Sequence, residues 1–341
     1  MTTKYFSQES TINVDAPPPS STNALTLAYR TFGDAKNPAV FIPTCYCGRL
    51  PNTMNFLYEA KPNQKTPPVL ANYFVITCGL LGGSESSSPS NTPAAIAGPR
   101  FPSVTYEDNI RMQVALCKAL GVARLHAYIG FSMGGQQAYH MGALYPGFVE
   151  RIVVVAGSAR TSWHNWSFLE GPKAALVNSV DWLDGNYSSP VVRGTAAFGR
   201  VYATWALSQA WFRGRQWEAA GCATLDEYLA KHWEQAMQTW DAHDLLAIMD
   251  TWQRGDISSC FPEDKGDLAT TLGRIEAKAL IMPVRTDLYF PPEDSEEEVK
   301  HLKHGKLCVI ESIGGHMTGG GGIYEEDNVF MSEEIGKWLA N

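Results

Sequence analysis

Short apolar runs alternate with segments of helical spacing along most of the chain. A strand is expected in ALTLAYRTF (24–32), after a polar lead with a Pro/Ser turn, DAPPPSST (15–22). Further strands are expected in PAVFIP (38–43), YFVITC (73–78), RLHAYIG (124–130), RIVVVAG (151–157), KALIMPV (278–284) and KLCVIE (306–311). Helical spacing covers 105–121, 133–146 and 292–305. Continuous apolar strands between helices predict an α/β fold with a mostly parallel sheet covered by helices on both faces.

One long stretch breaks this alternation. Residues 158–272 show helical patterns without a convincing strand, and they hold nine of the ten tryptophans. We therefore expect a core domain of residues 1–157 and 273–341, with a large helical lid inserted at 158–272. The tryptophans either fill the lid's own core or also line a substrate pocket, because large apolar pockets are built from such side chains.

Composition and charge exclude several classes of protein. The 341 residues are 45% hydrophobic and 18% charged, as in globular proteins, and the net charge is −8 without a basic run. Nothing therefore favours a nucleic-acid or membrane partner. The start lacks a signal-peptide core, and no apolar stretch approaches the roughly 20 residues of a membrane span. The seven scattered cysteines show no zinc spacing, so we expect reduced thiols, no metal and a cytoplasmic protein.

The segment AYIGFSMGGQQAYH (127–140) carries the clearest chemical signal. Gly130–Gly134 matches G-x-S-x-G between an expected strand and an expected helix. In that context the serine occupies a sharp turn, the nucleophile elbow, which exposes its hydroxyl at the carboxyl edge of the sheet. Ser132 is therefore the predicted nucleophile, and the N–H of Met133 is the first predicted oxyanion donor.

A serine nucleophile needs a general base and a carboxylate that orients it. His316, in ESIGGHMTGG, follows the last expected strand through a Gly-Gly loop that can carry it over the sheet edge. Asp287 follows the preceding strand, and Asp294, seven residues later, is the weaker candidate. The order Ser132, Asp287, His316 is that of α/β-hydrolases.

The loop TCYCG (44–48) follows the strand that normally supplies the second oxyanion donor. Tyr46 N–H is the first choice and Cys45 the second, with Cys45 also expected at the substrate. Alternatively, Cys45 and Cys47 are reactive thiols, although only Arg49 stands near enough in sequence to lower their pKa.

From about Leu25 onwards the chain resembles the homoserine O-acetyltransferase family of α/β-hydrolase-fold enzymes. The resemblance rests on LAYRTFGD, YFVITCGLLGGSESSSPSNTP, FPSVTYEDNIRMQVALCKALGV, GFSMGGQQA, WLDGNY, WDAHDLLAIMDTW, DLYFPPED and GGHMTGG. It implies a helical lid, an acyl-serine intermediate, acetyl-CoA as donor in the transferases, and a homodimer through the lid. By position it supports the same triad and oxyanion donors. It also implies that Arg200, in GTAAFGR, contacts the substrate; the alternative is a structural ion pair.

Two departures argue against homoserine as the substrate. In the family an aspartate usually follows the catalytic histidine and helps to hold the amino group of homoserine, whereas Met317 stands here. A thioether cannot pair with an ammonium group. The usual apolar-Thr-Gly of the oxyanion loop is Tyr46-Cys47-Gly48. A larger, less polar substrate is therefore expected.

Three functions remain open from the sequence. The leading hypothesis is a serine hydrolase without a cofactor that acts on an ester, lactone or related acyl compound. The first alternative is an O-acyltransferase with acetyl-CoA or another acyl-CoA as co-substrate, because the same triad serves both reactions. The second is a non-hydrolytic pocket protein or a cyclase on the same fold.

Overall fold

A mostly parallel sheet forms the centre of the protein. The computed structural model describes residues 2–7, 25–60, 68–83 and 85–340, so the turn expected at 15–22 lies outside the described residues. The described strands are β1 (Lys4–Ser7), β2 (Thr26–Phe32), β3 (Ala39–Pro43), β4 (Phe74–Cys78), β5 (Ala127–Phe131), β6 (Arg151–Val155), β7 (Lys278–Met282) and β8 (Gly305–Leu307). They form one sheet in the order β1-β2-β4-β3-β5-β6-β7-β8. Only β2 pairs antiparallel with its neighbours β1 and β4. The predicted α/β architecture is confirmed.

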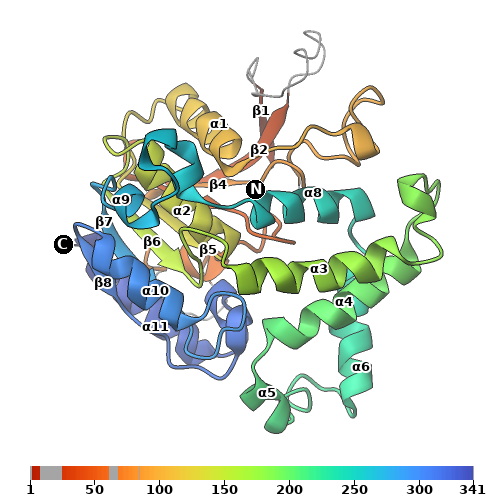
Figure 1. Ribbon diagram of the computed structural model, residues 1–341. Coiled ribbons are helices and arrows are strands. Elements are labelled where there is room, and N and C mark those ends of the chain that lie inside the picture. The colour runs from red at the N-terminus through yellow and green to blue at the C-terminus, as the bar shows by residue number, and fades with distance from the viewer. Residues whose placement is uncertain (1, 8–24, 61–67, 84, 341) are drawn as a thin grey trace.

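Helices cover both faces of this sheet (Figure 1). Tyr128 of β5 belongs to the core shared with α1 (Tyr106–Ala119) and α2 (Met133–Leu144). Its neighbour Ile129 belongs to the core shared with α11 (Glu325–Ala340) on the other face. Because successive strand residues point to opposite faces, a central strand must be apolar throughout. This requirement explains the uninterrupted apolar runs in the sequence.

The segment between β6 and β7 is helical. Its helices are α3 (Trp163–Val177), α4 (Val192–Ala206), α5 (Gln209–Arg213), α6 (Leu225–Leu229), α7 (Gln235–Met237), α8 (Ala242–Gln253) and α9 (Leu268–Leu272), with a π-helical turn at Ala230–Glu234. In Figure 1, α3 to α6 (green) extend to one side of the sheet. Trp211, Trp233 and Trp252 lie in the core of this segment, whereas Trp163 is 86% exposed.

Two elements were not expected from the sequence. Edge strand β1 is exposed and therefore carries no apolar run. Helix α11 buries Met331, Ile335 and Leu339 at a spacing of four, a signal that was present in the sequence.

Two other elements are shorter than expected. Strand β8 ends at Leu307, although the chain continues beside β7 as far as Ile310. Pro283 has no N–H with which to extend the β7 ladder. Helix α10 (Pro292–Glu298) gives way to a 3₁₀ turn at Val299–His301, short of the predicted helix end at 305.

Glu298 is a buried carboxyl group between α10 and the chain that follows β6. One carboxyl oxygen, Oε1, accepts a hydrogen bond from the N–H of Ala159 at 2.7 Å. Burial raises the pKa of Glu298 from 4.5 to about 8. At neutral pH the folded protein therefore holds a proton that the unfolded chain releases.

This proton should make the stability depend on pH. As pH rises from about 4.5 to about 8, the free energy of unfolding should fall by about 1.4 kcal/mol per pH unit, because only the folded state binds the proton in this range. Glu298→Gln should remove this component. Urea unfolding of both proteins between about pH 5 and about pH 8 measures the difference. If the free energy of unfolding changes equally with pH in both proteins, Glu298 does not hold this proton.

Candidate active site

Ser132 occupies a strained turn between β5 and α2. Its backbone has φ 58° and ψ −123°, a conformation that non-glycine residues rarely adopt. The turn is so tight that a Cβ on Gly130 would lie 1.9 Å from the carbonyl oxygen of Gly134. Only glycine fits at position 130, which explains the first glycine of the motif. Such strain is found where the surrounding fold holds a functional group in place.

The structure brings His316 and Asp287 to this serine. The Oγ of Ser132 lies 2.8 Å from Nε2 of His316, and Nδ1 of His316 lies 2.7 Å from Oδ2 of Asp287. All three residues are buried. With the hydrogen on Nδ1, the imidazole donates to Asp287 and accepts the serine hydroxyl hydrogen at Nε2. This is the geometry of a base that can deprotonate the serine.

Aromatic rings pack against the imidazole. The ring of Phe131 lies 4.8 Å from that of His316, and the ring of Tyr289 lies 4.6 Å away, measured between centroids. Gly315 has φ 66°, and a Cβ there would come within 2.7 Å of the Ser208 backbone nitrogen. The loop that carries His316 therefore lies directly against the helical segment.

Asp287 is held by the chain that follows it. Its Oδ1 accepts hydrogen bonds from the backbone N–H groups of Tyr289 (2.7 Å) and Phe290 (3.1 Å). These bonds leave Oδ2 directed at the histidine. Asp294, the weaker candidate, lies instead on α10, and burial raises its pKa. The structure thus places the first-choice carboxylate at His316.

The two predicted oxyanion donors lie on neighbouring segments. Met133 is the first residue of α2, and Tyr46 lies in the loop after β3. The Tyr46 side chain is buried and donates a hydrogen bond to the carbonyl of Leu245 at 3.0 Å, which ties this loop to α8. N–H groups at a helix start and in an adjacent loop can converge on one oxygen atom.

A buried glutamine that sequence reasoning missed joins these two segments. Gln137 Nε2 donates to the backbone carbonyls of Thr44 (3.1 Å) and Met133 (3.2 Å). Its Oε1 accepts from Gln113 at 2.7 Å, and Gln113 accepts in turn from the Tyr128 hydroxyl at 2.7 Å. The only sequence signal was a polar residue one turn into the helix after the elbow. Fully satisfied networks of this kind rigidify a site.

The two cysteines of the oxyanion loop are poor candidates for reactive thiols. Burial raises the pKa of Cys45 to about 12 and that of Cys47 well above its ordinary value. A thiol that stays protonated is a weak nucleophile. All seven cysteines are free. Cys45 and Cys47 instead line a cavity together with Met317.

Arg200 is held in ion pairs on the helical segment. Its Nη1 lies 2.9 Å from Asp226, its Nε donates to Glu234, and its side chain is 41% exposed. Phe198 and Tyr202 on the same helix are buried, so the core-facing side of α4 is apolar. Arg200 thus makes ion pairs of the kind that the sequence offered as the alternative, and its ion-pair partners in the described residues are Asp226 and Glu234.

We expect Arg200→Gln to change the activity little. Exposed ion pairs contribute little to stability, and the guanidinium already has two carboxylate partners. Values of kcat/KM for a neutral and an acidic acetate ester should each stay within about twofold of the wild-type values. A selective rise in KM for the acidic ester would show that Arg200 binds substrate after all.

The described residues contain no group of three or more His, Cys, Asp or Glu side chains that could hold a metal ion. None of the helices described has both the length and the apolar character of a membrane span.

Comparison with known proteins identifies the family. A family profile described as "alpha/beta hydrolase fold" matches residues 38–319, which include all three residues of the hydrogen-bonded chain. The chain belongs to the α/β-hydrolase fold family. In this family the strand–serine–helix turn presents a nucleophile at the carboxyl edge of the sheet.

Relatives within the family act on esters or transfer acetyl groups. The α/β hydrolase described here is 32% identical over 285 residues to an ethyl acetate hydrolase of Pseudomonas veronii, covering 83% of this chain and 80% of the relative. It is 30% identical over 258 residues to a homoserine O-acetyltransferase of Chloroherpeton thalassium, covering 72% and 66%. The solved structure of the acetyl esterase MekB matches with a TM-score of 0.90 at 27% identity, covering 100% and 97%.

Proposed function

We propose that this α/β hydrolase is a serine esterase that hydrolyses esters of short carboxylic acids through an acyl-serine intermediate. The hydrogen-bonded chain from Ser132 through His316 to Asp287 carries the proposal. An ethyl acetate hydrolase and an acetyl esterase among the similar proteins support it. The transferase relative shares less of its length with this chain.

In the first half of the reaction the ester acylates the serine. Ser132 Oγ attacks the carbonyl carbon while its proton moves to Nε2 of His316. The carbonyl oxygen becomes an oxyanion, which the N–H groups of Met133 and Tyr46 stabilise. The ester C–O bond then breaks, and His316 returns the proton to the departing alkoxide. Asp287 keeps the imidazole in the required tautomer and stabilises its charged form.

In the second half water replaces the alcohol. A water molecule gives its proton to Nε2 of His316 and attacks the acyl carbon, which forms a second oxyanion at the same donors. When this intermediate collapses, the bond to Ser132 Oγ breaks and the proton returns to Oγ. The products are a carboxylic acid and the free enzyme.

Large aromatic side chains support a short acyl group. Tyr289 and Phe290, whose rings lie 4.6 Å and 5.5 Å from that of His316, are fully buried, and Trp252 stacks on Phe290 at 5.7 Å between centroids. Because these rings fill the region beneath the helical segment, the acyl group should be of about acetyl size. The helical segment acts in this proposal as the lid over the site.

Acyl transfer from acyl-CoA to an alcohol is the second candidate, favoured by the homoserine O-acetyltransferase relative. The two reactions differ only in whether water or an alcohol reaches the acyl-enzyme. Stopped-flow measurement of acyl-enzyme formation from 4-nitrophenyl acetate and from acetyl-CoA separates them. Steady turnover of the ester in water, without acylation by acetyl-CoA, is the expected result. Acylation by acetyl-CoA together with a requirement for an alcohol acceptor would favour transfer.

Two further expectations come from the sequence and its resemblance. We propose a small-molecule acyl substrate in the cytoplasm and a homodimer formed through the helical segment. Light scattering of the purified protein tests the dimer directly, because a monomer mass would exclude it.

A further inference from the structure

A cavity of about 360 Å³ lies between the loop after β3, the segment around α7 and the loop that carries His316. Four of its lining residues are direct chain neighbours of the proposed catalytic and oxyanion residues: Phe131, Met317, Cys45 and Cys47. The ring of Phe131 also lies against that of His316. Phe131 thus connects this space, the inner cavity, to the imidazole, although Ser132 and His316 do not line it themselves. Tyr289 and Phe290 also pack against His316, but neither of them lines this cavity.

Apolar and sulfur-bearing side chains make up much of the lining of the inner cavity, and Arg49, Asn52, Thr53 and Thr239 are its polar members. Five sulfur-bearing side chains contribute to it: Cys45, Cys47, Met54, Met237 and Met317. Cys47 Sγ lies 3.9 Å from Met237 Sδ, so two of these side chains meet across the cavity wall. Flexible thioethers adapt to apolar ligands of varied shape. High thiol pKa values keep both cysteines uncharged, so they do not make this wall ionic.

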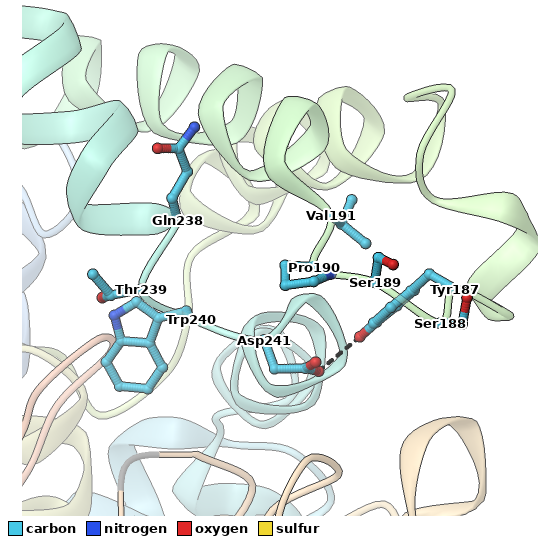
Figure 2. Close-up of a pocket in the computed structure, with 9 residues that line it drawn as sticks. All are labelled: Tyr187, Ser188, Ser189, Pro190, Val191, Gln238, Thr239, Trp240 and Asp241. Atoms are coloured by element: carbon cyan, nitrogen blue, oxygen red, sulfur yellow. Dashed lines mark hydrogen bonds between the residues drawn. The ribbon is translucent and has the colours of Figure 1, made fainter.

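Thr239 and Trp240 separate the inner cavity from a second one. Both residues line the inner cavity and also an outer cavity of about 390 Å³. Figure 2 shows the outer cavity, with Thr239 and Trp240 on one side and Tyr187 on the other, where the Tyr187 hydroxyl donates to Asp241 at 2.7 Å. These two residues, the wall, thus lie between two spaces of similar size.

Arg49 holds this wall in place. Its guanidinium carbon lies 4.3 Å from the centroid of the Trp240 ring, a cation–π contact. Its Nη2 donates to the carbonyl of Thr239 at 3.1 Å. Both contacts join the loop after β3 to the segment between α7 and α8. Arg49, in the loop after β3, therefore holds the indole of Trp240 in place.

We propose that the inner cavity holds the alcohol portion of the ester and that Trp240 limits its length. The inference rests on the proposed esterase function. The alkoxide takes its proton from Nε2 of His316, so the alcohol portion of the reacting ester lies near the imidazole. The inner cavity adjoins the imidazole through Phe131 and can hold this portion. Its thioether and aromatic side chains favour alkyl or aryl alcohols, and Trp240 borders it toward the outer cavity.

Trp240→Ala tests the inference because it should join the two cavities. The experiment measures kcat/KM for ethyl, butyl, hexyl and octyl acetate, and for ethyl esters of longer acids. We expect the octyl-to-ethyl ratio among acetates to rise by about tenfold or more, since each well-placed methylene contributes a severalfold gain. Preference among acyl chains should stay unchanged.

A matched variant controls for general effects on this segment. Gln238→Ala changes an exposed residue that lines only the outer cavity, and it should leave the ratio at the wild-type value. A shift in acyl preference in Trp240→Ala would overturn the assignment, because the inner cavity would then hold the acid. An unchanged alcohol profile would also overturn it.

A second variant keeps the test usable if Trp240→Ala does not fold. Arg49→Met removes the cation over the indole while keeping a long stem, and it should raise the octyl-to-ethyl ratio in the same direction. If the proposed esterase function is wrong, the result is different: no ester is hydrolysed, or Ser132→Ala retains its activity. Ester hydrolysis that depends on Ser132, with unchanged alcohol profiles in both wall variants, would refute this inference alone.

Discussion

Ser132→Ala should lower kcat/KM for 4-nitrophenyl acetate and ethyl acetate by about 10⁴ to 10⁶. The alanine lacks the Oγ that lies 2.8 Å from His316 Nε2, so no acyl-serine can form. Thermal stability should stay near that of the wild type, because this Oγ donates only to the imidazole within the described part of the chain. Steady-state hydrolysis assays and a melting curve measure the two quantities.

Residues that act as one unit show non-additive losses. A Ser132→Ala, His316→Gln double variant should therefore lose no more activity than the worse of the two single variants. Multiplied losses would mean that the serine and the histidine act independently. Full activity in Ser132→Ala would favour the pocket-protein or cyclase alternative.

Asp287→Asn should lower kcat for acetate esters by about 10⁴ with the fold intact. The amide can keep an oxygen at the N–H groups of Tyr289 and Phe290, so the loop is still held. Its NH₂ group then faces Nδ1 of His316. Since both groups cannot donate to each other, the imidazole carries its hydrogen on Nε2 and can no longer accept the serine proton. Steady-state kinetics and circular dichroism separate the loss of activity from unfolding.

Asp294→Asn is the matched control for this substitution. It removes the carboxylate of Asp294, which lies seven residues after Asp287 and which the sequence analysis ranked as the second candidate. We expect near wild-type kcat, because Asp294 lies on α10 whereas Asp287 bonds the imidazole. A large loss in Asp294→Asn with a small loss in Asp287→Asn would reverse the assignment of the carboxylate.

Much of the candidate site could be predicted from the positions at which the strands end. Ser132, Asp287 and His316 each come after a parallel strand, β5, β7 or β8, and the carboxyl ends of parallel strands share one edge. The apolar runs therefore predicted where the carboxyl edge of the sheet lies, and the serine, aspartate and histidine that follow them indicated the type of reaction. The structure joins these three residues by hydrogen bonds.

Contacts between distant segments could not be obtained in this way. The direction in which α4 presents Arg200 depends on how that helix packs, and the outcome is an ion pair with α6 and the following turn. Gln137 looked like any helical residue, because its partners at Thr44 and Gln113 lie on other elements. The indole wall likewise joins residues that are far apart in sequence. Local patterns carry no information about such pairs.

Mapping the acetylated residue after rapid quenching with 4-nitrophenyl acetate tests the central claim most directly. A burst of about one nitrophenol per enzyme, with the acetyl group on the peptide that contains Ser132, is the result expected for a serine activated by His316. The same experiment on His316→Gln should show no burst. Acetylation at Cys45 or another residue in the wild type, or turnover without any acylated peptide, would contradict the account.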